Sequence, residues 1–363
     1  MLKNQFHKFL CLSIVMLVYS LIAMPIIGNA ATISSQPKQA IQNALKKENA
    51  NAIVMVGSGK KPTIITNKAI VGEGTAPAIS TNKLFPIASF QKAITGMAIQ
   101  QLINHHQLSL NTKISKFFPE IPNSQQITIR NLLTHTSGLA DRSQIADQPL
   151  KSEKDSINFT KQNYRVINHP GQWHYANVNY GLLAIIVSKV SHESYETYVK
   201  KQIFKPNHLQ GMKFFNQLSS SKQLSPSLND HQFKFDSQET DSWRYLQREM
   251  SAEFGAGQIV ATPNCYWKFI NQIVLKQNDI LKQYQQINFQ PNDNPYYGGF
   301  YLHPNELHAN GSYEGYACTI FANTKKKQTI VLYSNNISLK QCRNLGYDLY
   351  HIYFGTNKQG FPY

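Results

Sequence analysis

A serine and a lysine three residues apart, Ser89 and Lys92, are two side chains of this 363-residue sequence that could act together in catalysis. On a helix, side chains at positions i and i+3 project from one face within reach of each other. A serine hydroxyl needs a neighbouring base, and a lysine amine can be that base only when burial or nearby positive charge lowers its pKa. The same spacing also begins at Ser35, Ser58, Ser80 and Ser219. Ser89 alone opens a long apolar segment, although an ordinary first-turn serine with a solvated lysine would give the same pattern.

Tyr175 and Asn177 follow Pro170-Gly171 and open a second apolar, helix-like run. A tyrosine hydroxyl can relay a proton if a nearby lysine lowers its pKa, and an asparagine amide can orient a substrate carbonyl. Taken alone, such a pattern is more often a buried tyrosine beside a turn.

The segment His308-Ala309-Asn310-Gly311-Ser312 lies between two runs of β-type sequence. A strand edge here could offer a backbone N–H to a developing oxyanion, with the N–H of Ser89 as the second donor. Asn-Gly is also the commonest signal for a hairpin, so a tight turn is the ordinary alternative.

Hydrophobic periodicity predicts the elements that must position these residues. Two β-type runs within 52–72 predict a hairpin, and apolar residues from 87 to 105 predict a mostly buried helix with Ser89 in its first turn. Further β-like runs occupy 297–303, 316–322 and 329–334, and helices are expected near 266–276 and at 339–354.

Strands at both ends of the chain with helices between them predict an α+β fold, in which an antiparallel β-sheet is flanked by helices and carries a mostly helical insertion domain. One domain over 46–363 is expected. Its sheet part would comprise 46–107 and 250–363, and its mainly helical part 108–249.

The N-terminal residues and the charge balance indicate the surroundings. Residues 1–30 combine two lysines with a long apolar run and a small-residue end, which is typical of a signal peptide or an uncleaved N-terminal anchor; a polar linker is expected over 31–45. Lysine and arginine number 36 against 20 acidic residues, a formal net charge of +16 that favours polyanionic partners. Because export argues against nucleic acid, anionic lipid and an anionic cell wall remain as the expected polyanionic surroundings.

The cysteines show no zinc-binding spacing. Cys318 lies in a strand-like run and Cys342 in the C-terminal helix, so the two could pair. Two buried free thiols are the favoured interpretation.

Taken in order, Ser89/Lys92, Tyr175/Asn177 and His308–Ser312 resemble the three motifs of the serine β-lactamase and penicillin-binding protein superfamily. Further segments are similar to its class C-like branch, which includes D-alanyl peptidases and esterases. These segments are Ile127-Thr128-Ile129-Arg130-Asn131-Leu132-Leu133-Thr134-His135-Thr136-Ser137-Gly138-Leu139, Tyr180-Gly181-Leu182-Leu183, and Gly255-Ala256-Gly257 followed by Ala261-Thr262. Within such a segment, His135 is expected to anchor a loop rather than to act as a base.

The resemblance implies a β-lactamase/transpeptidase-like fold and acyl transfer through an acyl-enzyme, with no metal and no other cofactor. It implies Ser89 as nucleophile, Lys92 as its activating partner and Tyr175 as proton relay to the leaving group. Substrate binding is expected at Asn177, His308, Asn310, Gly311 and Ser312. The backbone N–H groups of Ser89 and Ser312 would form the oxyanion hole.

The third motif departs from the family pattern, which places Lys or His two residues before a Gly, a few residues ahead of a Gly-aromatic pair, here Gly315-Tyr316. Counting back places Ala309 at the cationic position and His308 one residue early. Either a one-residue insertion keeps His308 in the site, or the site lacks that cation. Its loss would weaken recognition of the carboxylate that β-lactams and D-alanine peptide termini carry, whereas an ester would suffer less.

These observations predict an exported serine hydrolase acting on D-alanyl groups of the bacterial envelope, outside the cell or on its surface. It would be a D-Ala-D-Ala carboxypeptidase of peptidoglycan or a D-alanyl esterase of teichoic acid. The expected partners are peptidoglycan or teichoic acid, with β-lactams as further ligands, no nucleic acid, and a membrane only through an uncleaved N-terminal segment. The alternatives are a class C-type β-lactamase and a catalytically lapsed wall-binding or β-lactam-sensing module.

Overall fold

The computed structural model describes residues 35–228, 242–276, 281 and 294–355 of the chain. The segment 1–30, interpreted above as a signal or anchor, lies outside these ranges. Within them, no helix is long and apolar enough to cross a membrane.

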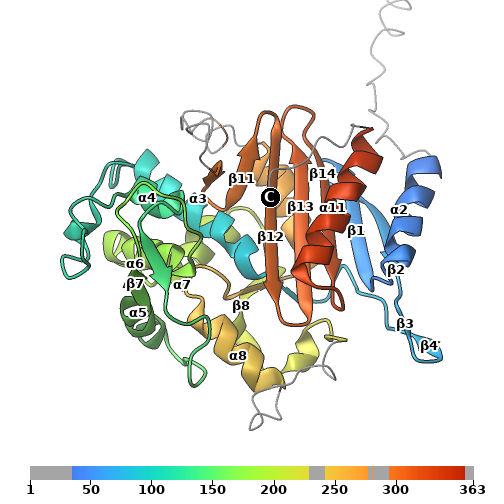
Figure 1. The fold of residues 1–363 in the computed structure, drawn as a ribbon, viewed down its shortest axis with the longest axis horizontal. Helices are drawn as coiled ribbons and strands as arrows, with labels where there is room; N and C mark the ends of the chain where they lie inside the picture. The colour runs from blue at the N-terminus through green and yellow to red at the C-terminus, as the bar shows by residue number, and fades with distance from the viewer. Residues whose placement is uncertain (1–34, 229–241, 277–280, 282–293, 356–363) are drawn as a thin grey trace, which may run out of the picture. The chain divides into compact units, whose positions relative to one another are not determined.

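A seven-stranded sheet with antiparallel neighbours forms the centre of the fold (Figure 1). The strands, in spatial order, are β10 (Tyr296–Tyr297), β11 (Phe300–His303), β12 (Glu306–Tyr313), β13 (Tyr316–Asn323), β14 (Gln328–Ser334), β1 (Ala52–Ser58) and β2 (Thr63–Asn67). Because β1 and β2 join the C-terminal strands, segments from the two ends of the chain complete one sheet. The predicted α+β class and the hairpin within 52–72 are confirmed.

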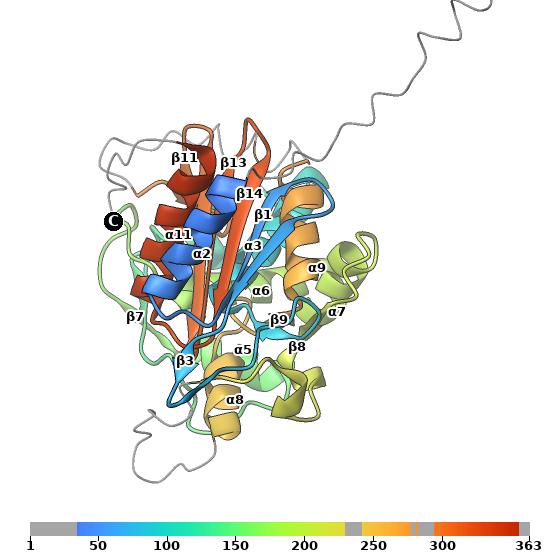
Figure 2. The ribbon, with the colours of Figure 1, turned by 90° about the vertical axis from the view of Figure 1, so that its right-hand side faces the viewer.

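Helices cover both faces of this sheet (Figure 2). The elements that matter most are α2 (Ser35–Lys47) and α11 (Leu339–Phe354) on one face, and η1 (Ala88–Gln91) with α3 (Lys92–Asn104) on the other. Along β1, Ile53 and Met55 join the core on the α3 side, and Val54 and Val56 join the core on the α11 side. Since both faces are buried, β1 is a continuous apolar run rather than an alternating one.

Helix α2 corrects the polar linker expected over 31–45. Residues 35–47 are helical, and Ile41 and Leu45, one turn apart, are fully buried together with Leu345 and Leu349 of α11. The helix therefore contributes a narrow apolar stripe that its neighbours cover, while its other side chains are mostly polar.

Helices and loops dominate the segment between the two sheet-forming parts. The helical elements are η2 (Ile114–Lys116), α4 (Ile129–Leu133), α5 (Glu153–Gln162), α6 (Asn177–Ser191), α7 (Tyr195–Val199), η3 (Lys200–Phe204), η4 (Phe215–Gln217), η5 (Ser221–Gln223) and α8 (Ser242–Ala252), followed by α9 (Pro263–Lys268) and η6 (Phe269–Val274). Small sheets are formed by β5 (Phe85–Pro86), β9 (Ile259–Ala261) and β8 (Met212–Phe214), by β6 (Leu139–Asp141) and β7 (Tyr164–Val166), and by β3 (Ile70–Val71) and β4 (Gly74–Thr75). Because β5 leads directly into η1, the pairing of β5 with β9 fixes the position of the chain just before Ser89.

The three cysteines of the described ranges, Cys265, Cys318 and Cys342, are buried free thiols, as favoured from the sequence. Burial raises the pKa of the Cys318 and Cys342 thiols well above its ordinary value. A thiol that stays protonated is a poor nucleophile, so these groups act as core side chains.

Candidate active site

Ser89 and Lys92 are held together at the junction of η1 and α3. The Lys92 Nζ donates a hydrogen bond of 2.8 Å to the Ser89 Oγ. Ala88, immediately before the serine, has a φ of 44°, in the left-handed region that residues with a Cβ rarely adopt. The flanking Phe90 and Ile94 are fully buried, which anchors the turn and leaves the partly exposed Ser89 at its surface.

Lys92 has no exposed surface and makes a second hydrogen bond of 2.8 Å to the Asn177 Oδ1. Its Nζ also lies 4.9 Å from the centroid of the Tyr175 ring. Burial lowers the pKa of Lys92 from 10.5 to about 8, against the opposing effect of the Glu253 and Asp141 charges. Much of the amine can therefore be neutral near pH 8, which is the condition for accepting the serine proton.

The Tyr175 hydroxyl hydrogen-bonds to Ser89, so the two sequence motifs meet in one site. Burial, the largest cause, raises the pKa of Tyr175 above its ordinary value of 10. Desolvation of the phenolate outweighs the hydrogen bonds from Ser89 and Tyr296 that lower this pKa, so a relay through Tyr175 does not rest on a lowered pKa. The hydroxyl is neutral and can pass a proton by accepting one and donating another.

Asn177 is positioned as the first residue of α6. The N–H groups of Asn177 and Val178 donate to the two carboxylate oxygens of Asp141, at 2.8 and 2.7 Å. Ala176, at the N-cap position of α6, has no side-chain acceptor for these N–H groups. The carboxylate of Asp141, the last residue of β6, takes that role. This acidic cap fixes the start of the helix beside Lys92.

His135 anchors the loop between α4 and β6, as expected. Its Nδ1 accepts a hydrogen bond of 3.3 Å from the Ala176 N–H and lies 3.0 Å from the Asn179 Nδ2, while its ring centroid lies 4.3 Å from that of Tyr175. Burial lowers the pKa of His135 well below its ordinary 6.5. The neutral ring ties this loop to the segment that carries Tyr175 and Asn177.

Strand β12 presents its residues alternately to the two faces of the sheet. Ala309 and Tyr313 lie in the core on the α3 side, and Gly311 lies on the same face, where an added Cβ would stand 2.4 Å from the Ile87 backbone oxygen. Strand β11 pairs only with residues 306–308, so the edge of β12 beyond them has no strand partner in the sheet and packs beside η1. The backbone at this edge, including Ser312, is available for the expected oxyanion role.

The side chains of Asn310 and Ser312 correct part of the predicted binding set, because the alternation directs them to the α11 side. The Asn310 Oδ1 accepts a hydrogen bond of 2.7 Å from Thr319, whose methyl group lies near Gly346 of α11. Ser312 pairs with Ala317, which belongs to the core on that side. These two residues can therefore serve the site only through their backbone.

His308 likewise lies on the α11 side and does not enter the site. Its ring stacks between those of Tyr301 and Phe321, with centroids 4.5 and 5.3 Å away. Burial lowers the pKa of His308 to about 3, so the ring is neutral at physiological pH. No insertion brings His308 inward, and Ala309 occupies the position expected for the family's cation.

We expect His308→Ala to lower the free energy of unfolding by about 2 kcal/mol, because it leaves a cavity between two aromatic rings. Ester hydrolysis should change by no more than about 3-fold, since the ring lies on the far face of the sheet. Urea unfolding and kcat/KM measure the two effects, with His105→Ala, at an exposed histidine, as the control. A large loss of activity at unchanged stability would place His308 in the site after all.

Glu253 is a site residue that sequence reasoning missed. Its Oε1 accepts a hydrogen bond of 2.9 Å from the Asn177 Nδ2, and its Oε2 accepts one of 2.8 Å from the Tyr313 hydroxyl. A Cβ at Gly257 would lie 2.0 Å from both the Glu253 Oε2 and the Tyr313 hydroxyl. Gly257, in the Gly255-Ala256-Gly257 segment noted in the sequence, thus makes room for this contact. That segment was the one signal in the sequence that pointed to Glu253.

The comparison with protein families agrees with this geometry. A family model described as Beta-lactamase matches residues 42–346, a range that includes all the site residues above. The chain belongs to the Beta-lactamase family. Membership confirms the superfamily resemblance and identifies the chain as a hydrolase of the serine type.

Two curated relatives are similar to this chain in sequence, and one solved structure is similar to it in fold. "Putative penicillin-binding protein PbpX" of Bacillus subtilis (strain 168) is 31% identical over 318 residues, covering 86% of this chain and 78% of that protein. "Teichoic acid D-alanine hydrolase" of Staphylococcus aureus (strain MRSA252) is 28% identical over 298 residues, covering 77% and 68%. The structure of D-amino acid amidase from Ochrobactrum anthropi SV3 in complex with D-phenylalanine superposes with a TM-score of 0.72 at 18% identity, covering 89% of this chain and 100% of that one.

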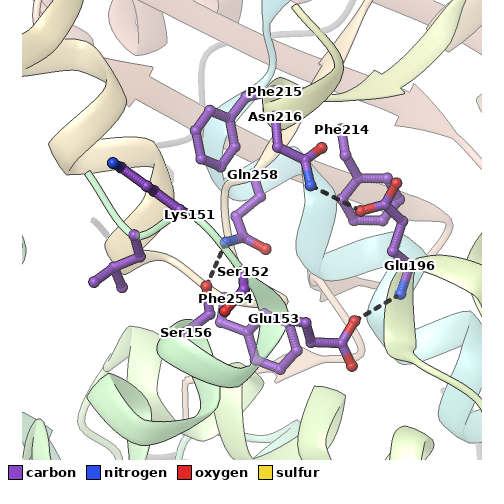
Figure 3. Close-up of a pocket in the computed structure, with 11 residues that line it drawn as sticks. Lys151, Ser152, Glu153, Ser156, Glu196, Phe214, Phe215, Asn216, Phe254 and Gln258 are labelled. Atoms are coloured by element: carbon purple, nitrogen blue, oxygen red, sulfur yellow. Dashed lines mark hydrogen bonds between the residues drawn. The ribbon is translucent and has the colours of Figure 1, made fainter.

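A separate pocket lies outside the Beta-lactamase-family site (Figure 3). Two carboxylates that line this pocket already accept hydrogen bonds from neighbouring residues. Glu153 accepts one of 2.9 Å from the Tyr195 N–H, and Glu196 accepts one of 3.0 Å from the Asn216 Nδ2. Its lining contains none of Ser89, Lys92 and Tyr175. Across the part of the chain that the structure describes, no three His, Cys, Asp or Glu side chains gather as a metal site requires.

Proposed function

We propose that this chain is an exported serine hydrolase that releases D-alanine from D-alanyl esters of teichoic acid at the bacterial cell surface. The observation that carries the choice of an ester is Ala309, an apolar side chain at the position where a cation would bind a substrate carboxylate. β-Lactams and peptides ending in D-alanine both carry that carboxylate, whereas a D-alanyl ester has none. The teichoic acid D-alanine hydrolase among the relatives supports the same choice.

The proposed reaction begins at the hydrogen bond between Lys92 and Ser89. The neutral amine takes the hydroxyl proton while the Ser89 Oγ forms a bond to the ester carbonyl carbon. The backbone N–H groups of Ser89 and Ser312 stabilise the resulting oxyanion. The C–O bond to the polymer then breaks, and the proton returns from Lys92 through the Tyr175 hydroxyl to the leaving alcohol. Water attacks the D-alanyl-enzyme, which frees D-alanine and restores Ser89.

The proposed setting is the cell envelope. Residues 1–30 would direct export, and the net charge of +16 would favour contact with the polyanionic teichoic acid. Nucleic acid is not expected as a partner.

A substrate panel tests the proposed function. Purified protein would be incubated separately with D-alanylated teichoic acid, a peptide ending in D-Ala-D-Ala, and penicillin, and released D-alanine and intact penicillin would be quantified by chromatography. We expect D-alanine from the teichoic acid and little from the peptide. Faster release from the peptide would make the chain a carboxypeptidase, and rapid consumption of penicillin would make it a β-lactamase.

The pH dependence of the reaction should follow Lys92. Because its amine must be neutral to accept a proton, kcat/KM for an ester without titratable groups should rise with pH and level off above about 8. The measurement is initial hydrolysis rates from pH 5.5 to 10, with protein integrity checked at each pH by circular dichroism. A profile already level at pH 6 would contradict the role of Lys92 as the base.

A further inference from the structure

The amide of Asn177 is already engaged on both its polar atoms. Its Oδ1 accepts from the Lys92 Nζ at 2.8 Å, and its Nδ2 donates to the Glu253 Oε1 at 2.9 Å. The sequence predicts that this amide orients a substrate carbonyl. The Nδ2 carries two N–H donors, of which Glu253 takes one, so a carbonyl bound at the other would lie near the Glu253 carboxylate, and two acceptors repel each other.

The surroundings of Glu253 favour a cation. The carboxylate is held by two neutral donors, the Asn177 amide and the Tyr313 hydroxyl. Of the charged groups that act on Glu253, Lys92 is positive and Asp141 is negative. Glu249, beside it, is in turn under the influence of both Glu253 and Glu314. Burial raises the pKa of Glu253, and Lys92 opposes that effect, so a second cation beside the carboxylate would further stabilise its charged form.

Three hydrogen bonds join Glu253 to the nucleophile. They run from the Ser89 Oγ to Lys92, from Lys92 to Asn177, and from Asn177 to Glu253, at 2.8, 2.8 and 2.9 Å. The α-nitrogen of an alanyl donor is two bonds from the carbonyl carbon that the serine attacks. A group that recognises this nitrogen must belong to the same network without touching the nucleophile. Glu253 is linked to Ser89 through Asn177 and Lys92, and it keeps part of its surface exposed.

We propose that Glu253 binds the free α-ammonium group of the acyl donor, so that the site selects D-alanyl esters and disfavours N-acylated D-alanyl donors. This inference rests on the proposed function and adds the group that determines specificity. A D-alanyl ester is joined through its carboxyl group and keeps its ammonium, whereas the D-alanine residues of a peptide stem carry an amide on nitrogen. The carboxylate forms a charge-assisted hydrogen bond with the first and repels the carbonyl of the second.

Two esters that differ only at nitrogen test the proposal. With the full-length enzyme, kcat/KM for D-alanine methyl ester should exceed that for N-acetyl-D-alanine methyl ester by about 10-fold or more. D-lactate methyl ester, in which a hydroxyl replaces the ammonium, should also be slower than D-alanine methyl ester. This series needs no variant, so it does not depend on how a substitution folds.

Glu253→Gln then separates recognition from positioning. We expect a rise in KM for D-alanine methyl ester that brings the ratio between the two alanine esters close to one, with the N-acetyl ester changed by no more than about 3-fold. Glu249→Gln, a matched loss of a neighbouring carboxylate that does not bind Asn177, should retain the preference. Labelling of Ser89 by a fluorophosphonate probe verifies that each variant is folded.

Three outcomes would overturn the inference. Equal losses on both alanine esters in Glu253→Gln would make Glu253 a residue that only positions Asn177. An equal rate on the two esters in the wild-type enzyme would reject ammonium selection while the proposed esterase stands. No hydrolysis of any ester, with turnover of penicillin or of the D-Ala-D-Ala peptide, would reject the proposed function itself.

Discussion

Ser89→Ala is expected to reduce kcat/KM for D-alanyl ester hydrolysis by about 1000-fold or more, with little change in the thermal unfolding midpoint. The Ser89 Oγ is the atom that would form the acyl-enzyme, and alanine offers no replacement. The side chain is partly exposed and loses a hydrogen bond from Lys92, so the fold should tolerate the change.

The control for this prediction is Ser58→Ala. Ser58 has the same spacing to a lysine but ends β1 as an exposed residue, so its loss should leave activity intact. Intact mass after incubation with a slowly hydrolysed D-alanyl ester adds a second readout, since the acyl adduct should form on the wild-type protein and on Ser58→Ala. An adduct on Ser89→Ala, or substantial remaining turnover, would show that another residue is the nucleophile.

Lys92→Met is expected to lower kcat/KM by about 100-fold to 10,000-fold, because the serine loses the group that accepts its proton. Methionine has a similar length, and an apolar side chain suits the space beside the Tyr175 and Tyr180 rings. At neutral pH two effects on stability oppose each other, because the variant removes a desolvated ammonium but also two hydrogen bonds. The net change in the free energy of unfolding should stay within about 2 kcal/mol.

The pH dependence of the free energy of unfolding tests whether Lys92 is desolvated in the folded state, which the prediction for Lys92→Met assumes. The pKa of Lys92 falls from 10.5 to about 8 on folding, so between these pH values the unfolded chain binds more protons than the folded one. Stability of the wild-type protein should therefore rise with pH across this interval relative to the variant. Urea unfolding of both proteins at pH 7 and pH 10 measures the difference. Parallel behaviour of the two proteins would mean that Lys92 is not desolvated in the folded state.

Local sequence patterns predicted the elements that carry their own signal. The helix expected at 339–354 is observed over Leu339–Phe354, and its start is fixed by a capping box of Ser338 and Gln341. The reciprocal contacts of this box are local in sequence, and the helix needs no distant partner to define its first turn. The pairing of β1 with β2 follows equally from neighbouring residues.

Helix α2 could not be predicted in the same way, because its stability depends on packing rather than on its own composition. Only Ile41 and Leu45 are apolar side chains that become fully buried in it, and part of the surface that covers them comes from α11, at the other end of the chain. A short polar sequence with so narrow a stripe resembles a linker until α11 is placed beside it.

The contacts of the candidate site likewise divide into those between sequence neighbours, which could be predicted, and those between distant residues, which could not. Ser89 and Lys92 are neighbours in sequence, and their contact was predicted from helical spacing. Glu253 reaches Asn177 and Tyr313 across 76 and 60 residues, so the neighbouring glycines could suggest a close contact but not its partners. The sequence also left undecided on which face of the sheet His308 lies. Counting back from Gly315 allows two registers for β12, and only its pairing with β11 and β13 distinguishes them.

The close approach of Gly311 to η1 restricts how relatives of this enzyme can evolve. A slip of β12 by one residue would turn His308 toward the nucleophile, but it would also move Asn310 into the place of Gly311, where a Cβ stands 2.4 Å from the Ile87 oxygen. Insertions or deletions in the turn before β12 therefore cannot supply a cation to the site. We expect descendants that acquire carboxylate-bearing substrates, β-lactam antibiotics among them, to do so by replacing Ala309 in an unchanged register.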